Sequence, residues 1–348
     1  MHFHTIIIGA GQAGLTAGFY LKRVVRSLLI LEASREVGSS WKSRYDALTL
    51  LTPAKYNALP KFGFPLPPNQ HPDKNEMASY LKHYAGFNDL PVHLNQTVKL
   101  LKKQNGDFWI ESDINSYVTS DLIIATGAHQ NPQYPNIPVD AGDELFQVHS
   151  VNYKNPSQIP GKKVLIVGSG NSASDIALDL CDTHEVSMSV KRKLRFRNFY
   201  TMGKSWFWWR EISGLMHIPA NSFLGRYYKK KKEPIYGKKL KTKIVNTQIK
   251  VKPQIKSING NQITFQSGEK EDFDAVIWAT GFTTDFSWIN IPQLFDLNGN
   301  PKYKKGVSNV PGLYFLGFEW QRSRSSSLVV GTDRDARYII KRLLYRKA

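Results

Sequence analysis

A short apolar run, a glycine-rich turn and a helical pattern of apolar residues follow one another twice along the chain. In the first copy the run 3–8 leads into the turn 9–14, and in the second copy the run 164–167 leads into the turn 168–173. An unbroken apolar run indicates a strand that is buried on both faces. The pattern therefore predicts two βα units, each within a doubly wound parallel sheet.

Both turns have the glycine spacing of dinucleotide-binding units. One glycine makes the tight turn, a second lets the backbone approach a pyrophosphate, and a third, replaced by alanine in the second copy, lets the helix pack closely on the strand. The helix that follows directs its free N–H groups and the positive end of its dipole at the phosphates. The candidate cofactor-binding residues of the turns are Gly9, Gly11, Gln12, Ala13 and Gly14 in the first, and Gly168, Ser169, Gly170, Asn171, Ser172 and Ala173 in the second.

The residue that follows the second strand of each unit has opposite charge in the two copies. At the same distance beyond the third turn position, the first copy has Glu32, followed by Ala33, and the second has Lys191, followed by Arg192. A carboxylate accepts hydrogen bonds from free ribose hydroxyls, whereas Lys and Arg pair with a ribose phosphate. The first site therefore suits an unphosphorylated adenosine, and the second suits NADPH, with NADH as a further possibility.

The two copies also end alike. An acidic residue, an apolar run and the triplet Ala-Thr-Gly occur at 121–127 and again at 274–281. Each segment predicts a strand that closes a nucleotide-binding domain, with a glycine turn where the backbone passes the cofactor. The candidate residues in these turns are Ala125, Thr126, Gly127, Thr280 and Gly281.

Two nucleotide sites of unlike ribose preference are explained most simply by electron transfer between two cofactors, a flavin in the first and NADPH in the second. We therefore expect an α/β protein with two doubly wound, Rossmann-like dinucleotide-binding domains. The expected FAD domain covers 1–155 and resumes at 275–348, and the NADPH domain, 156–274, is inserted between these two parts.

Further segments carry a family resemblance. The segment 38–41, Gly-Ser-Ser-Trp, resembles a GGxW segment that lies along a flavin, and 52–56 resembles the flavin-side turn that follows it. The segment 149–153 resembles the HSxxY end of a family fingerprint, and 312–317 resembles the return to the FAD domain. On these motifs the chain resembles the flavin-containing monooxygenases over nearly its whole length, and within them the short bacterial CzcO-like branch.

The resemblance implies that NADPH reduces FAD by hydride transfer and that a flavin hydroperoxide then oxygenates a small soft nucleophile, a sulfide or an amine. Many relatives have an Asn beside the flavin that helps to hold the oxygen adduct, and the matching position here is Leu51, whose side chain donates no hydrogen bond. The catalytic residues are left unassigned. The remaining candidate cofactor contacts are Ser40, Trp41, Leu51, Thr52, Val98 and Ser150.

Two other redox functions use the same architecture. A disulfide reductase needs a pair of cysteines, and the chain has Cys181 alone. An NAD(P)H oxidase or reductase, which releases hydrogen peroxide or passes electrons to another acceptor, remains the alternative, and it could act as an accessory protein at a membrane surface. The nine histidines have no metal-ligand spacing, so no metal site is expected.

The net charge of +19 is concentrated in part at 226–243, next to an aromatic-rich stretch that begins at Phe196. The aromatic residues could form a lid over the substrate channel, a homodimer contact, a packed insertion or a peripheral anchor on anionic lipid. No nucleic-acid-binding motif accompanies them, so we expect a small-molecule substrate and oxygen as partners rather than nucleic acid. No secretory signal or membrane span is apparent in the sequence, which favours a cytoplasmic location.

Overall fold

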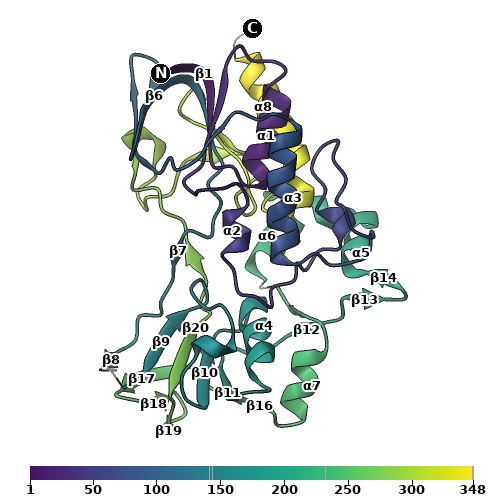
Figure 1. Ribbon diagram of the computed structural model, residues 1–348, viewed down its shortest axis with the longest axis vertical. Coiled ribbons are helices and arrows are strands. Elements are labelled where there is room, and N and C mark those ends of the chain that lie inside the picture. Colours follow the sequence, from purple (N-terminus) through teal and green to yellow (C-terminus); the bar gives the residue numbers. More distant parts are fainter. Residues whose placement is uncertain (141, 143, 232, 347–348) are drawn as a thin grey trace.

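Two α/β lobes, each built on its own sheet, make up the computed structural model (Figure 1). The structure describes residues 1–140, 142, 144–231 and 233–346. The N-terminal strand and the C-terminal helix both lie in the upper lobe of this view, and the middle of the chain forms the lower lobe. This arrangement confirms the expected α/β class with one nucleotide-binding domain inserted into another.

Parallel strands form the centre of the upper sheet. Their order is β3 (Val92–His93), β2 (Leu28–Leu31), β1 (His2–Ile8), β6 (Ser116–Ile124) and β25 (Leu313–Phe315). The sheet continues from β6 through the antiparallel strands β5 (Asp107–Ser112) and β4 (Val98–Gln104) to β22 (Ile289–Asn290), and the hairpin of β23 (Tyr303–Lys304) and β24 (Val307–Ser308) pairs with β25.

Alternate residues of the upper strands pack into separate cores, as the pleat of a strand requires. Ile7 and Ile30 are fully buried beneath the long helices, and Ile6 and Leu29 belong to the core on the other face of the sheet. The long helices are α1 (Gln12–Leu21), α3 (Lys74–Phe87) and α8 (Val329–Tyr345), which lie together in Figure 1, and the short ones are α2 (Ser39–Lys42), η1 (Ala54–Tyr56) and η4 (Pro292–Leu294).

The lower sheet is parallel throughout, and helices and a strand meander cover its two faces. Its order is β16 (Ile249–Lys252), β11 (Glu185–Ser189), β10 (Lys163–Val167), β20 (Ala275–Trp278) and β9 (Phe146–His149). One face packs against α4 (Asn171–Leu180) and α7 (Lys239–Val245), and the other packs against β17 (Ile255–Asn259), β18 (Gln262–Phe265) and β19 (Lys270–Asp272), to which β8 (Val139–Asp140) is added.

The lower sheet includes two strands from residue ranges that we expected to belong to the first domain. We assigned 1–155 and 275–348 to the first domain, yet β9 and β20 from these two ranges pair with each other and with β10 in the lower sheet. An apolar run predicts a buried strand, but it does not say which of two similar sheets the strand joins. The chain passes between the lobes at two short strands near β9 and β20 in the sequence, where β7 (Asn131–Pro132) pairs with β21 (Phe282–Thr283).

Residues 196–236, called the insertion below, leave the lower lobe and pack against the upper one. Phe207 and Met216 are buried against Tyr56, and Pro219 bridges to Ser323. Its elements are β12 (Phe196–Arg197), β13 (Tyr200–Thr201), β14 (Lys204–Ser205), α5 (Trp206–Ile212), η3 (Leu215–His217), α6 (Phe223–Lys230) and β15 (Ile235–Tyr236); the remaining short helix, η2 (Pro156–Gln158), precedes β10. Within the described residues, no helix combines the length and apolarity that crossing a bilayer requires.

Candidate functional site

A large cavity of about 2720 Å³ lies between the lobes, and both glycine-rich turns contribute to its wall. Gly14 and Ala173 lie outside the lining and pack within their own lobes. The structure therefore brings the other candidate residues to one cavity. They are Gly9, Gly11, Gln12, Ala13, Glu32, Ala33, Ser40, Trp41, Leu51, Thr52, Val98, Ala125, Thr126, Gly127, Ser150, Gly168, Ser169, Gly170, Asn171, Ser172, Lys191, Arg192, Thr280 and Gly281.

The glycines of the first turn have the separate roles that the spacing predicts. Gly9 has a φ of +104°, and a Cβ atom there would lie 2.6 Å from the Ala125 carbonyl oxygen. A Cβ atom at Gly14 would lie 1.8 Å from the Gly9 carbonyl oxygen, so only glycine lets the helix pack this closely. At Gly11 and Gly170, by contrast, a Cβ atom would meet no protein atom within 4 Å. These two positions leave the room that a pyrophosphate needs beside the backbone.

The helices that follow the turns begin without side-chain caps. The N-cap residues of α1 and α4 are Gly11 and Gly170, neither of which has a side chain to accept a hydrogen bond. The helix α3 differs, because Asp73 and Glu76 form a complete capping box at its start. The first N–H groups of α1 and α4 are thus left for phosphate oxygens, which fits a dinucleotide at each turn.

The carboxylate of Glu32 is held at the cavity wall by the backbone. Its Oε2 accepts a hydrogen bond from the Ala10 N–H at 2.8 Å, and its Oε1 accepts one from the Ser34 N–H at 3.0 Å. Each oxygen keeps a further lone pair, so both can also accept hydrogen bonds from ribose hydroxyls. This geometry fits the expected role of Glu32 at an unphosphorylated ribose.

At the second turn, Lys191 and Arg192 are exposed at the cavity wall and form no ion pair with any residue that the structure describes. Their charges are therefore available to a phosphate ligand. Lys230 and Lys231 of the basic run also line the cavity, whereas Lys232 lies outside the described residues. The positive charge of the protein is thus partly gathered where anionic cofactors would lie.

The cavity wall beside Thr52 contains an amide that the sequence reasoning missed. Asn57 is fully buried in the cavity wall, where its Oδ1 accepts a hydrogen bond from Thr52 Oγ1 at 2.6 Å. Its Nδ2 donates to the carbonyl oxygens of Thr52 and Pro53, at 2.9 and 3.2 Å. Because these contacts use the donors of the amide locally, Asn57 fixes the turn beside Leu51. The sequence feature that could have pointed to Asn57 is its place shortly after the Thr-Pro pair at 52–53.

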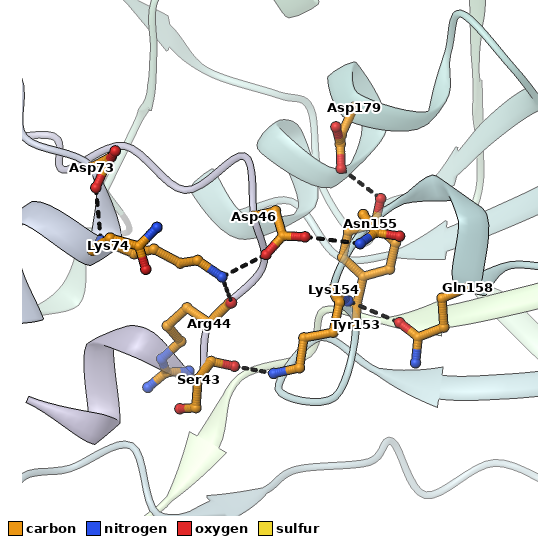
Figure 2. Close-up of polar contacts among 11 residues, drawn as sticks. Ser43, Arg44, Asp46, Asp73, Lys74, Tyr153, Lys154, Asn155, Gln158 and Asp179 are labelled. Atoms are coloured by element: carbon orange, nitrogen blue, oxygen red, sulfur yellow. Dashed lines mark hydrogen bonds and ion pairs between the residues drawn. The ribbon is translucent and has the colours of Figure 1, made fainter. Parts of the chain in front are cut away.

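A polar network joins the two lobes beside the cavity (Figure 2). Lys74 Nζ donates to the Arg44 carbonyl oxygen and pairs with Asp46 Oδ1, each at 2.6 Å. Asp46 Oδ2 accepts a hydrogen bond from Asn155 Nδ2 at 2.8 Å, and the Asp46 N–H donates to the Lys154 carbonyl oxygen at 2.8 Å. Asp46 is therefore the residue through which the upper lobe holds the chain that follows β9.

Tyr45 makes a second contact between the lobes. Its hydroxyl donates to Asp175 Oδ2 on α4 at 2.9 Å, and both residues line the cavity. Burial raises the pKa of Asp175 to about 6, although the hydrogen bond from Tyr45 acts in the opposite direction. Burial also raises the pKa of Tyr45. These residues are far apart in the sequence, so spacing alone gave no sign of the pair.

The single cysteine lies away from the cavity. Cys181 is the C-cap residue of α4, is half-buried rather than fully buried, and is absent from the cavity lining. Burial raises the pKa of its thiol, the reverse of what activates a redox cysteine. Within the described residues, no cluster of three His, Cys, Asp or Glu side chains is arranged to hold a metal ion.

Comparison with known proteins identifies the family of this site. Residues 6–205 match the family described as pyridine nucleotide-disulphide oxidoreductase, and residues 202–300 match the family described as flavin-binding monooxygenase-like. A protein of Geobacillus kaustophilus, described as an uncharacterized CzcO-like oxidoreductase, is 42% identical over 97% of each chain. The chain belongs to the CzcO-like branch of the flavin-binding monooxygenase family.

Other members of this family extend the comparison. A probable indole-3-pyruvate monooxygenase of Arabidopsis thaliana is 31% identical, and the match covers 90% of this chain and 84% of the relative. The structure of a flavin-containing monooxygenase from Stenotrophomonas maltophilia has a TM-score of 0.82 at 22% identity, covering 100% of this chain and 99% of that one, which shows the shared fold. The CzcO-like protein is therefore an oxidoreductase of a flavin monooxygenase family, and its cofactors are FAD and NADPH.

Proposed function

We propose that this enzyme uses NADPH to reduce FAD and inserts one oxygen atom of O₂ into a small soft nucleophile, a sulfide or an amine. The observation that carries this proposal is one cavity whose wall includes both glycine-rich turns, the acidic Glu32 and the basic Lys191. When bound, the cofactors supply the redox chemistry: hydride passes from NADPH to FAD, and the reduced flavin activates oxygen. We further propose that the candidate residues that line the cavity contact these two cofactors, and that Gly14 and Ala173 act through the close packing of their turns.

In this proposal the protein contributes binding, orientation and exclusion of water. The uncapped starts of α1 and α4 hold pyrophosphates, and Glu32 and Lys191 distinguish the two riboses. Phe207 and Met216 of the insertion are buried where they form part of the cavity wall, so they contribute apolar surface to it. An apolar wall protects a reactive oxygen species by keeping water away from it. Catalytic acid, base and nucleophile remain unassigned.

The alternative function is an NAD(P)H oxidase, and a specific observation favours it. The Leu51 side chain offers no hydrogen-bond donor at the position where the family resemblance implies an Asn in many relatives, and the amide of nearby Asn57 already donates to two carbonyl groups. An oxygen adduct without a donor to hold it would release hydrogen peroxide. A reductase that passes electrons to another acceptor would share the NADPH and FAD steps.

The coupling between NADPH oxidation and product formation decides between these functions. The purified, FAD-loaded enzyme is supplied with NADPH, oxygen and either thioanisole or N,N-dimethylaniline, and NADPH consumed, oxygenated product and hydrogen peroxide are measured together. The monooxygenase proposal expects product in near-equal amount to NADPH, with peroxide a minor fraction. Peroxide equal to the NADPH consumed, with both substrates, would contradict it and favour the oxidase. Catalase added to parallel reactions ensures that peroxide itself is not the oxidant.

Peripheral membrane contact and a homodimer are further proposals, and both concern the outer surface of the insertion. Phe223 and Tyr227 lie one helical turn apart on α6, 79% and 49% exposed, and Lys229 to Lys231 follow them. Exposed aromatic residues beside lysines suit an anionic lipid surface. Co-sedimentation with phosphatidylglycerol vesicles, compared with phosphatidylcholine vesicles, tests lipid contact, and light scattering tests the dimer.

A further inference from the structure

The backbone of the segment 43–46 is fixed to both lobes beside the cavity. The Arg44 carbonyl oxygen accepts a hydrogen bond from Lys74 Nζ, whose side chain is 8% exposed. Lys154 Nζ donates to the Ser43 carbonyl oxygen, and Asp46 is held by Asn155. Tyr45 is anchored to α4 through Asp175, so each residue of the segment has a defined backbone or side-chain contact. The position of Arg44 is thus set before any ligand binds.

The guanidinium group of Arg44 takes no part in this network. In Figure 2 the dashed line that reaches Arg44 ends on its carbonyl oxygen, and none ends on its guanidinium group. The guanidinium carbon lies 5.1 Å from the centre of the Phe282 ring, and Arg44 lines the cavity together with Trp41. No described residue forms a hydrogen bond or an ion pair with its side chain. Burial lowers the pKa of Arg44, yet an arginine side chain keeps its charge in a protein.

The lack of a carboxylate partner distinguishes Arg44 from comparable arginines. Among the described arginines that are at least partly buried, Arg210 and Arg324 pair with Glu233, and Arg322 pairs with Asp335. Arg210 also lies near aromatic rings, so contact with a ring does not replace an ion pair elsewhere in this protein. A charge that is partly removed from water without a partner is costly. An anionic ligand in the cavity would supply the missing partner.

We propose that Arg44 is an oxyanion-binding residue of the cavity, and this inference rests on the proposed function. Its guanidinium carbon lies over the ring of Phe282, which follows the Ala-Thr-Gly turn of the second nucleotide site. The N–H groups of an arginine form the planar fork that binds a carboxylate or a phosphate through two parallel hydrogen bonds. The oxyanion has two sources: the carboxylate of a substrate or the pyrophosphate of NADPH. Lys191 and Arg192 are not this site, because they follow β11 at the predicted ribose end.

Binding measurements on the FAD-loaded protein test this inference without turnover. The wild type, Arg44→Gln and Arg44→Lys are titrated calorimetrically with NADP⁺, and separately with phenylacetate and its neutral analogue phenylacetamide. Arg23→Gln is the matched control, because Arg23 also lies over a phenylalanine ring, at 4.5 Å from the Phe19 ring centre, but is exposed and absent from the cavity lining. Flavin absorbance and circular dichroism establish that each variant is folded and loaded.

We expect Arg44→Gln to weaken the binding of one of the two anions at least tenfold. Arg44→Lys should lose less affinity, and Arg23→Gln should bind both anions as the wild type does. Loss of phenylacetate binding alone would assign the oxyanion to a substrate carboxylate, and loss of NADP⁺ binding would assign it to the dinucleotide. Affinities for both anions within twofold of the wild type would overturn the inference. If Arg44→Gln does not fold, the Arg44→Lys result decides. A wild type that holds no FAD, or whose FAD is not reduced by NADPH, would instead contradict the proposed function.

Discussion

At the scale of single residues, we propose that charge at the ends of two strands determines which nucleotide each site accepts. Lys191→Ala combined with Arg192→Ala should weaken NADPH binding by about tenfold or more and leave NADH binding unchanged, because only NADPH has the ribose phosphate. The rate of flavin reduction against the concentration of each nucleotide gives the two affinities. Lys250→Ala is the control, since Lys250 lies exposed on the neighbouring strand β16 and away from the cavity. Equal losses for both nucleotides would show that the two cations do not recognise the phosphate.

Asp175 should make the stability of the protein depend on pH. Its pKa is raised to about 6 in the folded protein, so between about pH 4 and pH 6 the folded state holds a proton that the unfolded state has released. The contribution of Asp175 to the free energy of unfolding therefore falls as the pH rises through this window, by on the order of 3 kcal/mol. In the Asp175→Asn variant this pH-dependent loss of stability should be absent. Urea unfolding of both proteins at pH 4, 5, 6 and 7 measures the difference, and a difference that is constant with pH would contradict the prediction.

At the scale of elements, the first turn separates what the fold needs from what the cofactor needs. Gly14→Ala forces a Cβ atom against the Gly9 carbonyl oxygen, so it should lower the thermal midpoint of the protein. At Gly11 a Cβ atom meets no protein atom within 4 Å, so Gly11→Val should fill the space for the pyrophosphate and yield a folded but colourless protein. Thermal unfolding and the flavin absorbance of the purified proteins measure the two effects. A yellow, fully loaded Gly11→Val protein would contradict the assigned FAD turn.

The turns and strands could be predicted because their signals are local. The spacing of Gly9, Gly11 and Gly14 and the apolar runs beside them are enough to predict a βα unit, and the structure has one at each copy. The repeat of 121–127 at 274–281 predicts that β20 closes the second unit, and β20 does pair with β10. The membership of β9 in the lower sheet could not be predicted, because it depends on which parallel partner lies next to the strand. The contacts of Asn57, and the pairing of Tyr45 with Asp175, likewise depend on how distant segments meet.

At the scale of the whole molecule, the two lobes share one cavity, and the insertion extends its wall from the lower lobe to the upper one. Glu233 near the end of the insertion pairs with Arg210 of α5 and Arg324 of the upper lobe, so it fixes the insertion across this boundary. The aromatic residues of the insertion thus divide between a packed side and an exposed side. Packing, one of the expected roles, applies to its inner side, where Phe207 and Met216 also line the cavity, and the exposed residues of α6 are those of the proposed outer contacts.

The central claim is that one chain binds FAD and NADPH so that hydride passes between them. Anaerobic stopped-flow mixing of the purified protein with NADPH, followed by flavin absorbance, measures this transfer in a single turnover. The account predicts one FAD per chain, complete loss of the oxidised-flavin absorbance, and half-saturation at a much lower concentration of NADPH than of NADH. A protein without flavin, or a bound flavin that neither nucleotide reduces, would contradict it.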